Sequence, residues 1–325
     1  MQNDQDPLAG WVPFRLLINE PVPLVQWIYV YDQPFSHPFF DETVAHCRSH
    51  PYNSSRYKSV SSLESMLEWA ELLPEITPDA FIFHVSRCGS TLLSQLIGLD
   101  TAYTTLSEVP FFDEILRMHY KLKIERNVQE DLFAAAVKLI GKRRNHSEKK
   151  LFIKADSWHI FYEGLFRKLY PDTPLILLYR SPDEVEQSHQ KLRGMHAVPG
   201  LIEPDLFGLA ESEIEKFTLE DYIAYVLEKY LEKFDDIYKN DRHALLLDYK
   251  QGVLSMIEET ANYLNISWTE EHLLQMTERS KFHSKHPGQN FKEDSIQKNI
   301  PEYLKKATSL YQQLDRSRLS AALKK

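Results

Sequence analysis

The seven residues from 86 to 92, Ser-Arg-Cys-Gly-Ser-Thr-Leu, combine residue types that bind a phosphate. They follow an apolar run and lead into apolar residues at helical spacing, which predicts a loop between a buried strand and a helix. The N–H groups and dipole at a helix N-terminus attract an anion, and Gly89 allows the backbone to approach it closely. Arg87 adds a permanent, bidentate charge. We therefore expect an anion site, the alternative being a turn of small residues without a ligand.

Two common phosphate motifs do not fit this loop. When Gly89 is aligned with the second glycine of G-x-x-x-x-G-K-[ST], His84 replaces the first glycine and Ser90 replaces the lysine. That lysine neutralises the terminal phosphates of a nucleoside triphosphate, so an ordinary nucleoside triphosphatase is not expected. A phosphocysteine enzyme built on Cys88 would need an arginine six residues later, where Ser94 stands. We expect a ligand with a different arrangement of phosphates.

A second candidate site combines Arg180 with Ser188, eight residues later. Arg180 follows an apolar run, and open α/β sheets bind ligands at the carboxyl ends of their strands. Ser181 and Glu184 have the spacing of a capping box, which predicts a helix start directly after the arginine. An arginine and a hydroxyl in this arrangement can hold a second phosphate. The alternative is that Arg180 pairs with a nearby carboxylate and Ser188 is solvated.

Short apolar runs alternate with amphipathic segments beyond residue 78, which is the pattern of an α/β fold. Buried parallel strands are expected at residues 80–85, 151–155, 175–179 and 244–247. Helices are expected at residues 90–99, 129–144, 157–169, 182–192 and 218–238, with a docked helix after residue 299. The predicted architecture is a three-layer α/β/α fold with a central parallel sheet.

Residues 1–77, which precede this pattern, are rich in proline and aromatic residues. Apolar runs at 14–18 and 24–31 predict a hairpin, and a helix is expected at 63–73. Prolines then mark a boundary. We therefore predict an N-terminal extension over residues 1–77, packed on a main domain over residues 78–325.

The composition of the 325 residues excludes several classes of protein. With 38 basic and 47 acidic side chains the net charge is −9, which disfavours general binding to nucleic acid. Two cysteines, Cys47 and Cys88, argue against a disulfide framework and suit a reducing compartment. The N-terminus lacks the pattern of a signal peptide, and no apolar run approaches the roughly 20 residues of a membrane span. We expect a cytoplasmic protein and leave its oligomeric state open.

Together, the loop at 86–93 and the Arg180–Ser188 pair resemble the nucleotide-binding signatures of sulfotransferases that use 3'-phosphoadenosine 5'-phosphosulfate (PAPS). In that family the loop holds the 5'-phosphosulfate, and an arginine and a serine at this spacing hold the 3'-phosphate. The resemblance extends over about residues 78–290 and implies a P-loop-like fold. It assigns the 5'-phosphosulfate to Arg87, Cys88, Gly89, Ser90, Thr91 and Leu92, and the 3'-phosphate to Arg180 and Ser188.

Two departures from the family pattern leave the acceptor open. Many cytosolic members have lysine where Arg87 stands, and the arginine looks more like bacterial and carbohydrate-directed branches. The acceptor is therefore expected to be a small molecule or a carbohydrate. The basic, glycine-containing loop that covers the nucleotide in cytosolic members has its nearest counterpart at residues 284–289. Residues 193–208, which contain three glycines, predict either a flap over the acceptor or an insertion that packs on the N-terminal section.

The resemblance implies in-line transfer of a sulfuryl group to a hydroxyl or an amine, with Arg87 stabilising charge on the leaving phosphate. A general base must take the acceptor proton, and Glu108, Asp156 and His159 are the candidates. Glu108 is favoured because its position resembles that of the acidic base in some bacterial carbohydrate-directed members. The alternatives are a carboxylate that complements a helix dipole for Glu108, and helix capping and a packed ring for Asp156 and His159.

Two other functions stay open at the level of the sequence. A P-loop kinase is the second choice, weakened by the missing lysine, and a non-catalytic nucleotide-binding protein is the third. No metal is expected, because the family pattern requires none and the sequence has no H-E-x-x-H motif or carboxylate-rich loop. The histidines at 37, 46, 50, 283 and 286 are interpreted as surface or packing residues.

Overall fold

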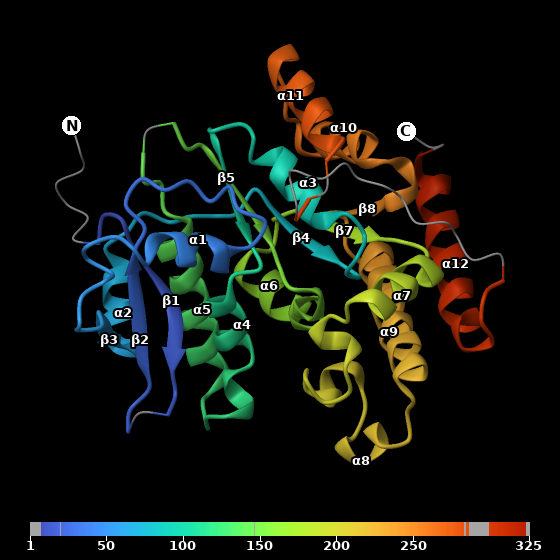
Figure 1. The fold of residues 1–325 in the computed structure, drawn as a ribbon, viewed down its shortest axis with the longest axis horizontal. Coiled ribbons are helices and arrows are strands. Elements are labelled where there is room, and N and C mark those ends of the chain that lie inside the picture. Colours follow the sequence, from blue (N-terminus) through green and yellow to red (C-terminus); the bar gives the residue numbers. More distant parts are fainter. Residues whose placement is uncertain (1–7, 20, 146, 283, 286–298, 323–325) are drawn as a thin grey trace. The chain divides into compact units, whose positions relative to one another are not determined.

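The computed structural model describes residues 8–19, 21–145, 147–282, 284–285 and 299–322 (Figure 1). The chain divides into two compact units, each discontinuous in sequence. The first unit comprises Met1–Ala80, Ile97–Lys154 and Gly164–Thr173. The second comprises Phe81–Leu96, Ala155–Glu163 and Pro174–Lys325.

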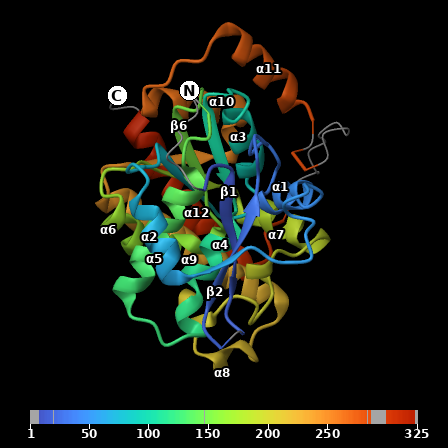
Figure 2. The same cartoon turned by 90° about the vertical axis from the view of Figure 1, so that its left-hand side faces the viewer.

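A three-stranded antiparallel sheet begins the first unit. Strands β1 (Trp11–Leu17) and β2 (Leu24–Tyr29) form a hairpin, seen in blue in Figures 1 and 2, and β3 (Val60–Ser62) pairs with β2. The register shifts between Pro13 and Arg15, where proline cannot donate to the ladder. Helices α1 (Phe40–Cys47) and α2 (Leu63–Glu71) accompany the sheet.

The first unit also contains two strands, β5 (Tyr103–Ser107) and β6 (Lys150–Lys154), which pair in parallel. The helical elements of this part are α4 (Pro110–Leu116), the 3-10 turn η1 (Met118–Tyr120), α5 (Arg126–Gly141) and α6 (Glu163–Leu169). Helices α4 and α5 pack on β1, and α5 packs on α2. The N-terminal residues therefore share one core with the helices that follow β5.

In the second unit three strands lie in parallel in the order β4 (Ala80–His84), β7 (Leu175–Tyr179) and β8 (Ala244–Asp248). Every residue of β4 and of β7 is buried, which explains their uninterrupted apolar runs. Strands β5 and β6 of the first unit are likewise paired in parallel. The expected α/β class with a parallel sheet flanked by helices is confirmed.

Helices and 3-10 turns make up the rest of the second unit. Those that precede β8 are α3 (Ser90–Ile97), η2 (Ser157–Tyr162), α7 (Pro182–Lys191), η3 (Met195–Ala197), η4 (Pro204–Phe207), α8 (Glu211–Ile214) and α9 (Leu219–Asn240). Those that follow it are η5 (Tyr249–Gln251), α10 (Val253–Leu264), α11 (Glu270–Ser280), η6 (Glu302–Leu304) and α12 (Lys305–Ala322). Helix α9 packs against both α7 and α12.

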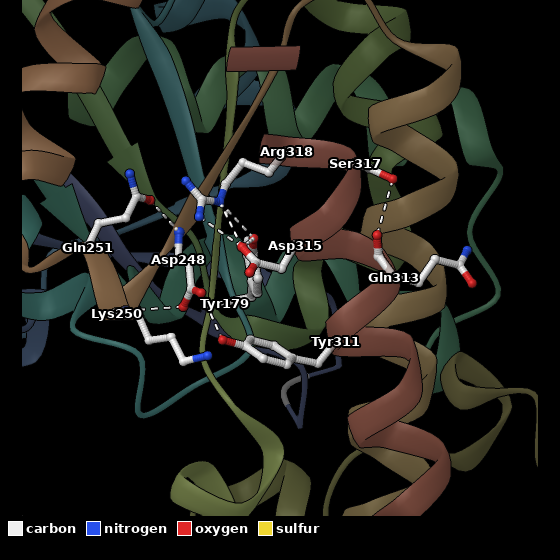
Figure 3. A network of polar contacts seen from close by, with 9 residues as sticks. All are labelled: Tyr179, Asp248, Lys250, Gln251, Tyr311, Gln313, Asp315, Ser317 and Arg318. Atoms are coloured by element: carbon white, nitrogen blue, oxygen red, sulfur yellow. Dashed lines mark hydrogen bonds and ion pairs between the residues drawn. The ribbon is translucent and has the colours of Figure 1, made fainter. Parts of the chain in front are cut away.

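Polar contacts anchor helix α12 to the last residues of β7 and β8 (Figure 3). The Tyr311 hydroxyl donates to Asp248 at 2.8 Å, and Arg318 donates to the Tyr179 hydroxyl at 3.1 Å and to Asp315 at 2.8 Å. Asp248 is fully buried, and burial raises the pKa of its carboxyl. The network therefore fixes the carboxyl ends of two strands from the side of the C-terminal helix.

Four of the five parallel strands were expected within one residue of their observed bounds, but β5 was not expected. Its sequence, Tyr-Thr-Thr-Leu-Ser, has a single aliphatic residue, so it lacks the apolar run of a buried strand. Thr104, Thr105 and Ser107 are nevertheless buried in the structure. A hydroxyl-rich strand is recognisable only from its neighbours in the sheet.

Candidate functional site

The loop between β4 and α3 has an unusual backbone. Ser86, Arg87 and Gly89 adopt positive φ angles of 67°, 52° and 80°, in the left-handed region. For residues other than glycine this conformation costs on the order of 1–3 kcal/mol and persists only where surrounding contacts enforce it. Alternation of left-handed with right-handed residues can turn N–H groups toward a common concave face that binds anions, and Cys88, between Arg87 and Gly89, is not left-handed.

Two buried side chains enforce this backbone. His84 Nδ1 accepts a hydrogen bond from the Ser86 N–H at 3.1 Å, and Ser157 Oγ lies 3.3 Å from the same nitrogen. The Cys88 thiol is fully buried and donates to the Leu178 carbonyl of β7 at 3.5 Å. His84 thus takes a structural role where phosphate-binding loops of the common motif have glycine, and the Cys88 side chain is directed into the core.

Tyr249, the first residue after β8, contacts both candidate phosphate sites. A Cβ atom on Gly89 would lie 2.9 Å from the Tyr249 ring, so the loop and the ring fit only with glycine at this position. The Arg180 guanidinium carbon lies 4.1 Å from the centroid of the same ring, a cation–π distance. Sequence reasoning missed Tyr249 because no motif contains it. Its position at the end of a strand was the only available signal.

Arg180 is held from three sides. Its Nε donates to Glu184 at 2.9 Å, its Nη1 donates to the Arg87 carbonyl at 3.1 Å, and the ring of Tyr249 covers one face. Its Nη2 makes no hydrogen bond within the part of the chain that the structure describes. Because Arg180 binds the backbone of the phosphate loop directly, the structure brings the two sequence signatures together.

The predicted capping box at the start of α7 is wrong. Ser181 is the N-cap residue but makes no side-chain cap hydrogen bond, and its hydroxyl contacts Asp183 instead. Glu184 pairs with Arg180 rather than with the helix end. A positively charged guanidinium attracts the carboxylate more strongly than a neutral backbone N–H does, and the spacing alone could not reveal this competition.

The remaining candidate nucleotide-site residues lie in the first turn of α3 and along α7. Ser90 and Thr91 are buried in the first turn of α3, and Leu92 is half-buried. Ser188 is half-buried on α7, and its hydroxyl has no hydrogen-bond partner among the described residues. Arg87 directs its guanidinium toward the end of α7, where Nη2 donates to the Leu192 carbonyl at 2.5 Å.

Two of the three base candidates lie in the second unit and cap η2. The His159 N–H donates to the Asp156 carbonyl at 3.0 Å, and His159 Nδ1 accepts a hydrogen bond from the Asp156 N–H at 3.3 Å. His159 is 2% exposed. This arrangement matches the capping and packing that the sequence left open as the alternative for these two residues.

Glu108, the third candidate, lies in the first unit just after β5. Its carboxylate is 2.6 Å from the ammonium of Lys154, which is fully buried at the end of β6, and its N–H donates to the Lys154 carbonyl at 2.8 Å. The φ angle of Glu108 is 49°, so this residue also has a left-handed backbone. Glu108 therefore has one certain task, which is to compensate a buried positive charge.

Two loops were expected to surround the nucleotide or the acceptor. In the candidate C-terminal loop, residues 286–289 lie outside the described residues. The carbonyl of Ser284, at the start of this loop, accepts a hydrogen bond from Arg279. Arg279 also donates to Gln95 of α3 at 2.7 Å. The segment 193–208 is packed within the second unit, where the Tyr225 hydroxyl of α9 donates to the Phe207 carbonyl at 3.1 Å.

Comparison with known proteins identifies the family. The family model described as the sulfotransferase domain matches residues 77–314. No curated protein matches the chain. Among solved structures, similar folds include a sulfotransferase domain from the curacin biosynthetic pathway (14% identity, TM-score 0.49, 74% of this chain and 99% of the other). Another is sulfotransferase STF9 from Mycobacterium avium, with 13% identity and a TM-score of 0.44 over 80% of this chain and 81% of the other. A third is mouse sulfotransferase SULT7A1 complexed with PAP, with 13% identity and a TM-score of 0.40 over 80% of this chain and 91% of the other.

A match over residues 77–314 covers well over half of the chain, so this protein belongs to the sulfotransferase family. The resemblance that the two nucleotide signatures indicated is thereby confirmed at the level of the family. None of the described helices is long and apolar enough to cross a membrane.

Proposed function

We propose that the protein transfers a sulfuryl group from PAPS to a hydroxyl or an amine of a small-molecule or carbohydrate acceptor. The observation that carries this proposal is the direct contact between the two signatures, in which Arg180 donates to the carbonyl of Arg87. This contact sets one anion site at a fixed distance from the other. A nucleotide with phosphates at both its 5' and 3' positions would occupy both.

The described residues fit such a nucleotide. The loop around Gly89 and the N-terminus of α3 would offer backbone N–H groups to a 5'-phosphosulfate, with the Arg87 side chain beside them, whereas the Ser86 N–H is held by His84. Arg180 retains donors on Nη2 for a 3'-phosphate, since Glu184 and the Arg87 carbonyl occupy the other nitrogens. Ser188 supplies a hydroxyl on the helix that follows. Neither site relies on the lysine that a nucleoside triphosphate would need.

The proposed reaction exchanges one sulfur–oxygen bond for another. The bond from sulfur to the oxygen that bridges it to the 5'-phosphate breaks, and the electron pair stays on that phosphate. A new bond forms between sulfur and the acceptor oxygen or nitrogen, whose proton passes to a general base. The chain's own contribution is to orient the reactants and to stabilise the negative charge on the leaving phosphate through Arg87 and the loop N–H groups.

We retain Glu108 as the proposed base, with Asp156 and His159 as the other candidates. As a base, Glu108 would lose its catalytic role on substitution by glutamine, which we expect to lower turnover by about 10²- to 10⁴-fold with nucleotide affinity unchanged. Lys154→Met is the matched control, because it breaks the same ion pair but leaves the carboxylate. Near-normal turnover by Glu108→Gln would reject this assignment and direct attention to Asp156 and His159.

The transfer itself is tested with PAPS that carries a radiolabelled sulfate. Purified protein is incubated with the labelled donor and a desalted cell extract that supplies candidate acceptors. We expect label in one or a few acid-stable products, and none with Arg87→Ala. Release of label only as inorganic sulfate, with no labelled product from any acceptor fraction, would count against the proposed activity.

A further inference from the structure

His189, the neighbour of Ser188 on α7, takes no part in the contacts that join the two anion sites. Its side chain is completely buried. Its Nδ1 accepts a hydrogen bond from the backbone N–H of Gly194 at 3.1 Å. A ring nitrogen that accepts from a backbone N–H carries no proton of its own, so the proton of a neutral ring lies on Nε2. His189 therefore presents an N–H donor at Nε2.

The Nε2 donor of His189 lacks a hydrogen-bond acceptor among the described residues. Among the described residues, Nε2 of His189 is buried without any hydrogen-bond partner, and Nη1 of Arg193 is in the same condition. Buried N–H groups are nearly always satisfied, because leaving one unpaired costs about 1–3 kcal/mol. Two unpaired donors so close in the chain suggest that a ligand with acceptor atoms completes the site.

The surroundings of His189 favour a negatively charged ligand. Burial, together with the nearby cations Arg87, Arg193 and Lys285, lowers the pKa of its imidazole to about 3. The ring is therefore neutral at physiological pH and keeps a single N–H. An anion placed among these three cations would meet opposite charge from each of them.

His189 and Arg87 of the phosphate loop hold the same stretch of backbone. Arg87 donates to the carbonyl of Leu192, and Gly194, two residues further along, donates to His189. Both side chains thus hold the same three-residue stretch of backbone at the end of α7. Gly194 permits this approach, because a Cβ atom there would lie 3.2 Å from the His189 ring and 3.1 Å from the His196 ring.

We propose that Nε2 of His189 donates a hydrogen bond to an oxygen of the sulfonate group of PAPS, beside the guanidinium of Arg87. This inference rests on the proposed function. Arg180 with Ser188 is assigned to the 3'-phosphate and the loop with Arg87 to the 5'-phosphosulfate, so a donor near Arg87 would serve the 5'-phosphosulfate, whose terminal group is the sulfonate. A neutral imidazole orients it without adding a further positive charge. His189 would thus distinguish PAPS from PAP, which has no sulfonate.

Two substitutions separate this role from simple anchoring of the loop. In His189→Asn the side-chain oxygen can still accept from Gly194, as Nδ1 does, but nothing replaces the donor at Nε2. In His189→Gln the longer amide can place an N–H near the Nε2 position, while the acceptor for Gly194 is lost. A donor role predicts damage from asparagine and tolerance of glutamine. An anchoring role predicts the reverse.

The measurement is isothermal titration of the wild type and both variants with PAPS and with PAP. We expect His189→Asn to weaken PAPS binding by about 10- to 100-fold, the value of one hydrogen bond to a charged group, while PAP affinity is retained. His189→Gln should keep most of the wild-type ratio of PAPS to PAP affinity. If the asparagine variant does not fold, the glutamine variant still tests the donor role, which predicts that its ratio of PAPS to PAP affinity stays close to that of the wild type.

The proposed role of His189 would be overturned if His189→Asn kept the wild-type ratio of PAPS to PAP affinity. It would also be overturned if only His189→Gln reduced that ratio. In either case the wild type would still bind both nucleotides, and the proposed function would stand. Failure of the wild type to bind either nucleotide would instead reject the proposed function itself. The two failures are therefore distinguishable in one set of titrations.

Discussion

At the scale of single residues, the phosphate loop requires glycine at position 89. Its φ angle of 80° is rarely adopted by other residues, and the Tyr249 ring occupies the space of a Cβ atom. Tyr249 in turn supports Arg180. A larger residue at position 89 must therefore disturb the backbone of one proposed anion site and the support of the other.

We predict that Gly89→Ala lowers the free energy of unfolding by about 1–3 kcal/mol and abolishes measurable nucleotide binding. Gly208→Ala separates the two causes, because Gly208 has a φ angle of 76° but no neighbouring atom within 4 Å of the position that an alanine Cβ would occupy. Gly164→Ala is the neutral control in helix α6, where alanine should be tolerated or stabilising. Chemical denaturation and titration with PAP measure both effects. Normal PAP affinity in Gly89→Ala would contradict the close fit.

The sequence was informative about residues that belong to motifs and silent about those that support them. It singled out Arg87, Gly89 and Arg180 because their types and spacing suit phosphate binding. Tyr249 and His189 belong to no motif, and each becomes significant only through a neighbour outside its own segment. Such contacts arise from the packing of strands and helices, so a single sequence cannot reveal them.

At the scale of elements, Glu114 couples helix α4 to strand β1 in the first unit. Its carboxylate accepts a hydrogen bond from the Leu16 N–H, and burial raises the pKa of Glu114 to about 7. The folded state thus binds a proton more tightly than the unfolded chain, whose glutamate has a pKa near 4.5. The resulting stability is complete below that value and is lost as the pH rises through about 7.

Replacement of Glu114 by glutamine should remove this pH dependence. We expect Glu114→Gln to exceed the wild type in stability at pH 8 by up to about 3 kcal/mol, with the difference shrinking toward pH 4.5. Urea denaturation at several pH values provides the measurement, and Glu68→Gln, on an exposed face of α2, serves as the control. A difference between Glu114→Gln and the wild type that does not change with pH would argue against the buried carboxylate.

Helix α12 is held to the sheet by hydrogen bonds to buried groups as well as by apolar packing. Because Asp248 is fully buried, losing the Tyr311 hydroxyl would leave it with one acceptor oxygen less well satisfied. We predict that Tyr311→Phe lowers the free energy of unfolding by about 1–3 kcal/mol. Ser317→Ala, which removes an exposed contact within the same helix, should change it by less than about 0.5 kcal/mol. Equal stability of the two variants would contradict the role assigned to the network in Figure 3.

At the scale of the whole molecule, the sequence predicted the α/β class because buried parallel strands leave a strong apolar signal. It could not predict how the N-terminal residues are incorporated. The structure groups them with later segments in the first unit, where Arg144 donates to the Gln33 carbonyl at 2.7 Å and Lys138 pairs with Glu75 at 2.5 Å. These are long-range contacts without a pattern in the sequence.

The proposed boundary at residue 77 can therefore be tested by truncation. Removal of residues 1–77 would expose apolar surface on helices α4 and α5, which pack on β1. We expect the fragment 78–325 to lack a cooperative thermal transition and to be digested rapidly by a protease, whereas the full chain melts cooperatively and resists digestion. A fragment that melts cooperatively and binds PAP would show instead that the N-terminal residues form a dispensable extension.

Two anion sites, joined through Arg180, are proposed to bind a nucleotide phosphorylated at its 3' and 5' positions. The most direct test is the thermal stability of the protein with PAP, ADP and magnesium-ATP in parallel. A ligand at 100 times its dissociation constant adds about 2.7 kcal/mol, which shifts the melting temperature by degrees. We predict a shift with PAP alone, lost in Arg180→Ala. Stabilisation by magnesium-ATP and none by PAP would contradict this nucleotide preference and favour a phosphotransferase.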